Sequence, residues 1–159
     1  MEIEKRWLWQ DITNKRKLEF FSENDWQKTA YLFDKNSLTS CRFRCRPKLD
    51  GTYSCKITVK TGKGLSRIEI EKEITKEEFD ELTKDLYVMT TQFTKIGPWE
   101  IKCIDDKVII EREFDSIEEA ISFDDTELQV DLGLGIFKDV TNDSDYNVIN
   151  FYKKKVLND

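Results

Sequence analysis

Apolar and polar residues alternate along most of the first 114 residues, which is the pattern of strands that bury one face. In residues 53–60, for example, cysteine, isoleucine and valine share one face, while lysine and threonine share the other. The pattern predicts eight strands, at residues 2–9, 27–34, 39–47, 53–60, 66–74, 87–96, 99–104 and 107–114. Short turns such as Asp50-Gly51 and Gly97-Pro98 separate most of them, which favours antiparallel neighbours.

Helix signals are fewer. The pairs Thr75/Glu78 and Ser116/Glu119 are capping-box sequences, and they predict helices that run to about residues 86 and 123. A terminal helix is expected over about residues 143–154. Residues 10–25 are rich in turn formers, so we expect them to be irregular.

The polar positions of the predicted strands are sorted by charge. Residues 2–9 carry Glu2 and Glu4 on one face, whereas residues 39–47 carry three arginines on one face. Other strands present Lys56 with Lys60, Arg67 with Glu69 and Glu71, and Glu111 with Glu113. Two interpretations are open at this point: a solvated, salt-bridged sheet face, or a closed barrel whose charged face lines its interior.

If the strands close into a barrel, helices outside it can cover the apolar face while the charged face lines the interior. The expected fold is α+β and mainly β: a closed eight-stranded antiparallel β-barrel, or tunnel, with a few helices packed outside it and at the C-terminus. A chain of 159 residues suits one domain, which we expect to span residues 1–159.

Charges enclosed in a barrel are tolerable if the interior is wet or holds a charged ligand, since burying an unpaired ion costs several kcal/mol. Arginine and lysine favour phosphate, and arginine binds it in bidentate fashion. Clustered glutamates favour a hard divalent cation such as Mg²⁺ or Mn²⁺. The combination predicts a site for a polyphosphate with bound metal.

Composition narrows the chemistry. The chain has no histidine, which excludes histidine bases, histidine triads and histidine-bound zinc. Its net charge of -6 disfavours a protein that binds duplex nucleic acid nonspecifically. No apolar run approaches the roughly 20 residues that cross a bilayer, and the acidic start lacks a signal segment, so we expect a cytoplasmic protein without membrane contact.

The cysteines show no metal-binding spacing. Cys41, Cys45, Cys55 and Cys103 form no C-x-x-C pair, so a zinc site is not expected. We expect all four to be buried, reduced thiols that behave as small apolar residues.

An ordered set of motifs resembles the triphosphate tunnel metalloenzymes, also called the CYTH superfamily. The chain opens with Glu2-Ile3-Glu4-Lys5-Arg6, close to the family signature E-x-E-x-K, with arginine in the last place. The further matching runs are Arg42-Phe43-Arg44, Thr58-Val59-Lys60, Arg67-Ile68-Glu69-Ile70-Glu71, Glu111-Arg112-Glu113 before a capped helix, and Val140 to Asn147, which is similar to V-T-x-D-x-x-Y-x-N with the asparagine one place early. The resemblance covers nearly the whole chain. It implies an eight-stranded tunnel in which basic residues hold a triphosphate and acids hold one or two divalent metals.

The charge pattern and the resemblance together nominate site residues. The expected substrate-binding residues are Arg6, Arg42, Arg44, Lys60, Arg67 and Lys102. The expected ligands of Mg²⁺ or Mn²⁺ are Glu2, Glu4, Glu69, Glu71, Glu111 and Glu113, and the expected catalytic residues are Arg6, Glu4 and Glu111. For each glutamate the competing interpretation is an internal salt bridge to a facing arginine or lysine.

Three departures from the family pattern bear on function. Thr90 and Gln92 stand where the family has basic residues, Lys102 stands where it has an acid, and Asp145 replaces a basic residue. The leading hypothesis is a metal-dependent triphosphatase that acts on inorganic triphosphate or nucleoside triphosphates, as a monomer or homodimer. The alternatives are a non-catalytic protein that binds nucleotides or polyphosphate, and a class IV-type adenylate cyclase.

Overall fold

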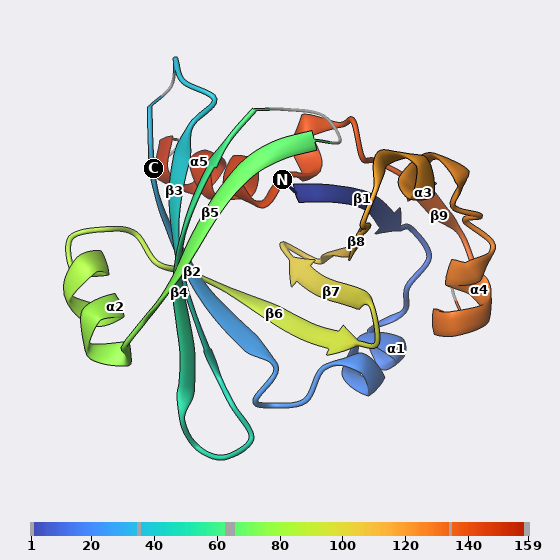
Figure 1. Ribbon diagram of the computed structural model, residues 1–159. Helices are drawn as coiled ribbons and strands as arrows, with labels where there is room; N and C mark the ends of the chain where they lie inside the picture. Colours follow the sequence, from blue (N-terminus) through green and yellow to red (C-terminus); the bar gives the residue numbers. More distant parts are fainter. Residues whose placement is uncertain (1, 35, 63–65, 134, 158–159) are drawn as a thin grey trace.

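The computed structural model describes residues 2–34, 36–62, 66–133 and 135–157, and its centre is a closed antiparallel β-barrel (Figure 1). Strands β1 to β8 form the barrel, in the order β5-β4-β3-β2-β6-β7-β8-β1. Strand β1 pairs with β5 to close it, and Glu2 lies opposite Arg67 at that seam. The expected fold class is therefore confirmed. The strands are β1 (Glu2–Trp9), β2 (Trp26–Phe33), β3 (Ser40–Pro47), β4 (Tyr53–Thr61), β5 (Ser66–Ile74), β6 (Met89–Ile96), β7 (Trp99–Ile104), β8 (Lys107–Glu113) and a short β9 (Phe137–Asp139) that pairs with β1.

Both capping boxes begin helices as expected. Thr75 and Glu78 cap each other reciprocally at the start of α2 (Lys76–Thr83), and the Ser116 hydroxyl accepts from the Glu119 amide at the start of α3 (Ile117–Ser122). The terminal helical region divides into a short 3-10 helix, η1 (Ser144–Tyr146), and α5 (Val148–Leu157). Helix α2 ends three residues earlier than expected.

The irregular structure expected over residues 10–25 is wrong in part, because α1 (Asn14–Phe20) lies there. The Thr13 side chain accepts from the Arg16 amide and caps this helix. A helix α4 (Glu127–Leu132) also went unforeseen, and it ends at Gly133 in the left-handed conformation. Both helices have few turns and weak periodicity, so packing rather than pattern stabilises them.

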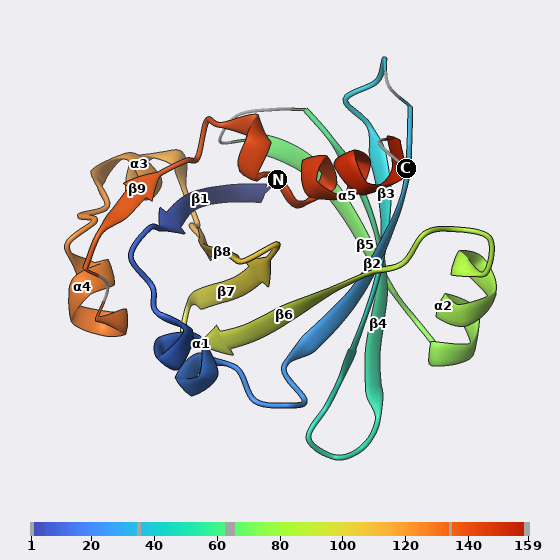
Figure 2. The same ribbon diagram turned by 180° about the vertical axis from the view of Figure 1, so that it is seen from behind.

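Helices cover the outer, apolar face of the barrel (Figures 1 and 2). On one side Trp7, Trp99 and Ile110 are fully buried against Leu128 of α4. On the other side, Phe79 of α2 packs in the cluster that contains residues of β3 and β4. This arrangement leaves the charged face directed inward, as the sequence predicts.

Only part of the barrel interior is charged. Helix α5 crosses the barrel near the end at which β2 ends and β3 begins (Figures 1 and 2), and its Tyr152 ring lies 5.2 Å from that of Tyr31. Phe151 of α5 belongs to the same buried cluster as Ile104 and Ile109, which share a face with Lys102 and Glu111. The helix therefore fills one section of the interior with apolar side chains.

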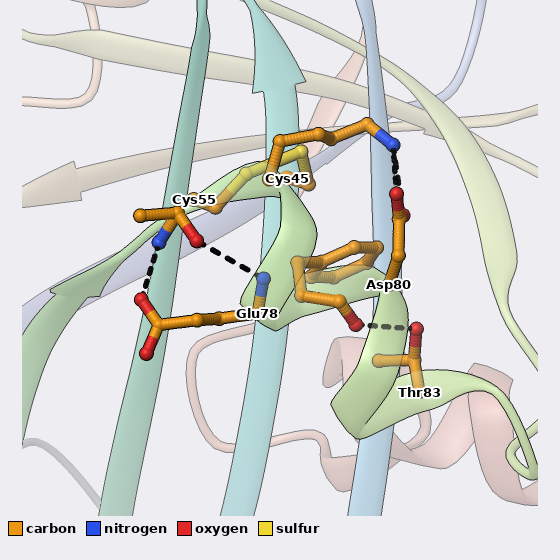
Figure 3. The surroundings of a disulfide bond; sticks show 8 residues. Cys45, Cys55, Glu78, Asp80 and Thr83 are labelled. Carbon is orange, nitrogen blue, oxygen red and sulfur yellow. Dashed lines mark hydrogen bonds and ion pairs between the residues drawn. A yellow bond between two sulfur atoms is a disulfide. The ribbon is translucent and has the colours of Figure 1, made fainter.

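Two of the four cysteines are not free thiols, which corrects the expectation of reduced thiols. Cys45 and Cys55 are opposite each other on β3 and β4 and form a disulfide beside α2 (Figure 3). The antiparallel register brings these two residues together, and spacing along the chain does not reveal it. Cys41 and Cys103 are free.

In the described part of the chain, none of the helices has the length and apolar character needed to cross a bilayer.

Candidate active site

Inward-facing side chains from all eight strands of the barrel line a cavity of about 450 Å³, which we call the charged cavity. All but three of its 17 lining residues are charged. They are Glu2, Glu4, Gln27, Arg42, Arg44, Arg46, Ser54, Lys56, Lys60, Glu69, Glu71, Phe93, Lys95, Glu100, Lys102, Glu111 and Glu113. Of the nominated residues, only Arg6 and Arg67 do not line it.

A second cavity of about 290 Å³, which we call the α5 cavity, lies between α5 and the ends of β2 and β3. Arg6 and Arg67 line it. It shares five lining residues with the charged cavity: Glu4, Arg42, Lys60, Lys102 and Glu111. The two cavities are therefore the two ends of one passage through the barrel, and every nominated residue lines one of them.

The two glutamates of β1 face cations from the opposite side of the seam. A Glu2 carboxylate oxygen lies 2.9 Å from Lys60 Nζ and 3.1 Å from Arg67 Nη2. Arg67 also lies 2.6 Å from Glu4, which pairs with Arg6 at 2.8 Å. These ion pairs do not fully compensate Glu4, because burial and the nearby charges of Glu111 and Glu2 raise its pKa to about 7.

A third carboxylate joins this pair. Glu113 on β8 is directly opposite Glu4, and oxygens of Glu2, Glu4 and Glu113 lie within 4.8 Å of one another. Three carboxylate oxygens that converge are suitable ligands for a hard divalent cation. Glu2 and Glu4 are buried while Glu113 is exposed, so the cluster is accessible from the charged cavity.

Glu111 lies outside this three-carboxylate cluster among the described residues. Its side chain is 5% exposed, with one oxygen 2.8 Å from Lys102 Nζ and the other 3.4 Å from Arg6 Nη2. Burial alone would raise the pKa of Glu111, but the charges of Lys102 and Arg6 hold it well below its usual value. Glu111 is thus an ionised counter-ion for two cations of the passage.

Glu69 and Glu71 differ in their partners. Burial and a hydrogen bond with Glu2 raise the pKa of Glu69 to about 8. For Glu2 the effect of burial is outweighed by that hydrogen bond and by Lys60 and Arg67, so its pKa falls to about 2. Glu69 and Glu2 therefore share a proton near neutral pH. Glu71 instead pairs with Lys56 at 2.9 Å and Arg44 at 3.4 Å.

Arg42 is a buried cation without a carboxylate. Within the described part of the chain it forms no ion pair; its hydrogen-bond partner is Tyr31, and its Nε has none. It lies in the section that both cavities share. Against the effect of burial, Glu111 and Glu2 help to raise the pKa of Arg42 through their charges without touching its guanidinium. Among the described residues the guanidinium therefore has no direct anionic partner, and the passage is prepared for an anion at this position.

The structure adds lining residues that the sequence did not nominate. Arg46 and Lys56 line the charged cavity, and the Arg46 guanidinium lies 5.1 Å from the Phe93 ring centre. Lys95 and Glu100 also line it. These charged residues alternate with apolar neighbours along their strands, and that alternation could have predicted that they face the cavity.

The expected loss of two cavity cations on β6 assumed that Thr90 and Gln92 face the interior, and the structure shows that they do not. Thr91 is paired with inward-facing Gln27, and Phe93 with Lys102, so the inward residues of β6 include Thr91, Phe93 and Lys95. Thr90 and Gln92 lie on the other face and are exposed. Lys95 is the basic residue that β6 presents to the charged cavity.

The run after Val140 reaches the passage through Arg6. The Arg6 amide donates to the Thr141 hydroxyl at 3.0 Å, and the Arg6 guanidinium donates to the Asn147 side-chain oxygen. The segment before α5 thereby fixes the Arg6 side chain in position.

Three solved structures resemble this chain. PH1819 from Pyrococcus horikoshii OT3 aligns with a TM-score of 0.53 and 17% identity over 87% of this chain and 93% of that one. The putative adenylyl cyclase HpAC1 from Hippeastrum, described as having a dominant triphosphatase activity, aligns with a TM-score of 0.56 and 13% identity over 96% of both chains. The inorganic triphosphatase NE1496 aligns with a TM-score of 0.48 and 20% identity, over 94% of this chain and 96% of that one.

The sequence itself matches no family model and no curated protein. The shared feature is thus the fold, which extends over nearly the whole chain in PH1819 and HpAC1.

Proposed function

We propose that this protein is a divalent-metal-dependent triphosphatase that cleaves a phosphoanhydride bond inside the barrel. One observation carries the proposal: a cluster of three carboxylates and a buried, unpaired arginine line the same enclosed cavity. The cluster suits a hard cation and the arginine suits phosphate, so both halves of a metal-bound polyphosphate have partners. HpAC1, which shares the fold, is described as having triphosphatase activity.

The residues divide into three roles. Glu2, Glu4 and Glu113 would hold Mg²⁺ or Mn²⁺, with Glu69 next to Glu2. A divalent ion there supplies positive charge to phosphate oxygens and makes a water molecule more acidic. The phosphates would lie along Arg42, Arg44, Lys60 and Lys102, which project from three different strands.

Positioning residues support this arrangement. Glu111 holds Lys102 and Arg6 in place, and Arg6 is fixed from its other side by Asn147. Arg67 joins Glu2 to Glu4 and keeps the seam between β1 and β5 closed. Preorganised cations of this kind stabilise the charge of a phosphoryl-transfer transition state without having to reorganise.

The direct experiment is phosphate release from tripolyphosphate and from ATP, first with Mg²⁺ and then with Mn²⁺. We expect release with at least one metal and none in excess chelator. Tight metal-dependent binding without release would instead show a binding protein, and formation of cyclic AMP would show a cyclase. The case for a pure binding protein was the apparent loss of cations at Thr90 and Gln92, and these positions face away from the cavity.

Glu113→Gln tests the metal site. It removes one carboxylate from the cluster, so the metal concentration for half-maximal rate should rise at least about tenfold. Glu23→Gln is the matched control, because Glu23 is exposed and lines neither cavity. If the two variants require the same metal concentration, the cluster is not the metal site.

A further inference from the structure

The two ends of the passage differ in chemistry. Charged side chains dominate the charged cavity, as described above. In the α5 cavity, the walls beyond the shared section are formed mainly by Tyr31, Phe33, Leu38, Val148 and Ile149 together with hydroxyl and amide side chains. Among the described residues, Lys153 is the one further charge there besides Arg6 and Arg67.

An inorganic triphosphate would leave these apolar walls unused. Sites for small organic molecules combine apolar walls with a few converging polar groups, and about 290 Å³ is near the lower limit of their volume. Leu38 of this cavity is 62% exposed. The α5 cavity thus has the composition of a site for an organic group that is joined to the phosphates.

Two asparagines supply directional hydrogen bonds. The Asn147 side-chain oxygen accepts from Arg6, which leaves its amide NH₂ to donate. The Asn150 side-chain NH₂ donates to the Ser144 carbonyl, which leaves its oxygen to accept. One donor and one acceptor on neighbouring turns can pair with the edge of a heterocyclic base.

An aromatic ring lies in the same cavity. Phe33 is half-buried, and Lys153 Nζ lies 4.8 Å from its ring centre. Lys153 is a flexible side chain that a flat ligand can displace from the ring. Any of the nucleic-acid bases can stack on an aromatic ring, because each has a flat π-face.

The position of the carboxylate cluster sets a direction. Glu2 and Glu113 line only the charged cavity, whereas Arg42, Lys60 and Lys102 line both cavities. A triphosphate on the shared cations would place its terminal phosphate toward the cluster and its other end in the α5 cavity. That other end is where a nucleoside is attached.

We propose that the α5 cavity is a nucleoside subsite and that the substrate is a nucleoside triphosphate rather than inorganic triphosphate. The base stacks on Phe33 and its edge pairs with Asn147 and Asn150. This inference rests on the proposed triphosphatase function, but it concerns a different part of the passage.

The test compares kcat/KM for ATP, GTP and CTP with that for tripolyphosphate. The wild type should prefer at least one nucleoside triphosphate. Phe33→Ala should lower the ratio of kcat/KM for that nucleotide to kcat/KM for tripolyphosphate about tenfold. Leu38→Ala should lower it about two- to threefold, and it cannot disturb the core because Leu38 is exposed. Leu18→Ala is the matched control: Leu18 is 78% exposed and lies on α1, outside both cavities.

Equal losses on both kinds of substrate, or a wild-type preference for tripolyphosphate, would overturn the subsite. Absence of hydrolysis with any substrate would overturn the proposed function instead. In that case, calorimetric binding of ATP and tripolyphosphate with Mg²⁺ decides the matter. The subsite is supported if Phe33→Ala weakens ATP binding relative to tripolyphosphate binding while Leu18→Ala leaves the ratio of the two affinities unchanged. It is refuted if Phe33→Ala also leaves that ratio unchanged.

Discussion

The buried ion pair between Lys102 and Glu111 gives the sharpest test of how the passage is built. Both side chains are 5% exposed, and the two charged atoms lie 2.8 Å apart. Their attraction is about 6 kcal/mol at an effective dielectric constant of about 20, and desolvation offsets much of it. Lys102→Met leaves the Glu111 carboxylate buried with Arg6 as its remaining partner, at 3.4 Å.

Because breaking a buried pair costs about 3–5 kcal/mol and Arg6 compensates in part, we expect a loss of about 3 kcal/mol in the free energy of unfolding. That corresponds to a decrease of about 6–12 °C in Tm for a chain of this size. The double variant Lys102→Met/Glu111→Gln removes both charges, so it should recover at least half of the loss. Urea unfolding of the metal-free wild type, both single variants and the double variant measures the free energies, and a thermal melt measures Tm.

The control is the exposed pair of Glu81 and Lys84 on α2, which is 2.6 Å apart with side chains 73% and 59% exposed. Lys84→Met should cost no more than about 0.5 kcal/mol. If Lys102→Met costs as little as Lys84→Met, or if the double variant loses the sum of its single losses, Glu111 does not serve mainly as a counter-ion.

Three further predictions follow from the site and the fold. Arg42→Met should lower kcat/KM for the triphosphate substrate about 10- to 100-fold without destabilising the ligand-free protein, since it removes a buried, unpaired charge; a large loss of stability in urea would contradict this. The pKa of Glu69, raised to about 8, means that the folded state holds the proton more tightly than the unfolded chain, so Tm of the metal-free protein should fall as pH rises from about 4.5 through 8. Glu69→Gln should reduce that slope but not abolish it, because the pKa of Glu4 is also raised, to about 7; an unaltered slope would show that Glu69 does not contribute to it. Thr75→Ala removes the reciprocal cap of α2 and should cost about 0.5–2 kcal/mol in urea unfolding, unless the helix end is already frayed.

Strand alternation predicted most of the barrel because burial of one face leaves a period of two in the sequence. Strand β6 shows where this fails. Thr90 and Thr91 are adjacent and chemically alike, so neither face is marked, and a shift of one residue exchanges the faces of the whole strand. Its pairing with β2 and β7 decided the face instead.

Short helices were also hidden from the sequence. Helices α1 and α4 have seven and six residues, too few for an apolar stripe to repeat. The disulfide was hidden for a different reason, since Cys45 and Cys55 become neighbours only through the register of β3 with β4.

The sequence by itself determined that this chain forms a barrel with a charged interior, because alternation and charge sorting are properties of single strands. The tertiary structure alone decided how those charges are used. Closure of β1 on β5 and the register with β8 bring Glu2, Glu4 and Glu113 together, whereas Lys102 and Arg6 neutralise Glu111. The pattern treats these four glutamates alike, and their difference depends on distances of a few ångströms between strands that are far apart along the chain.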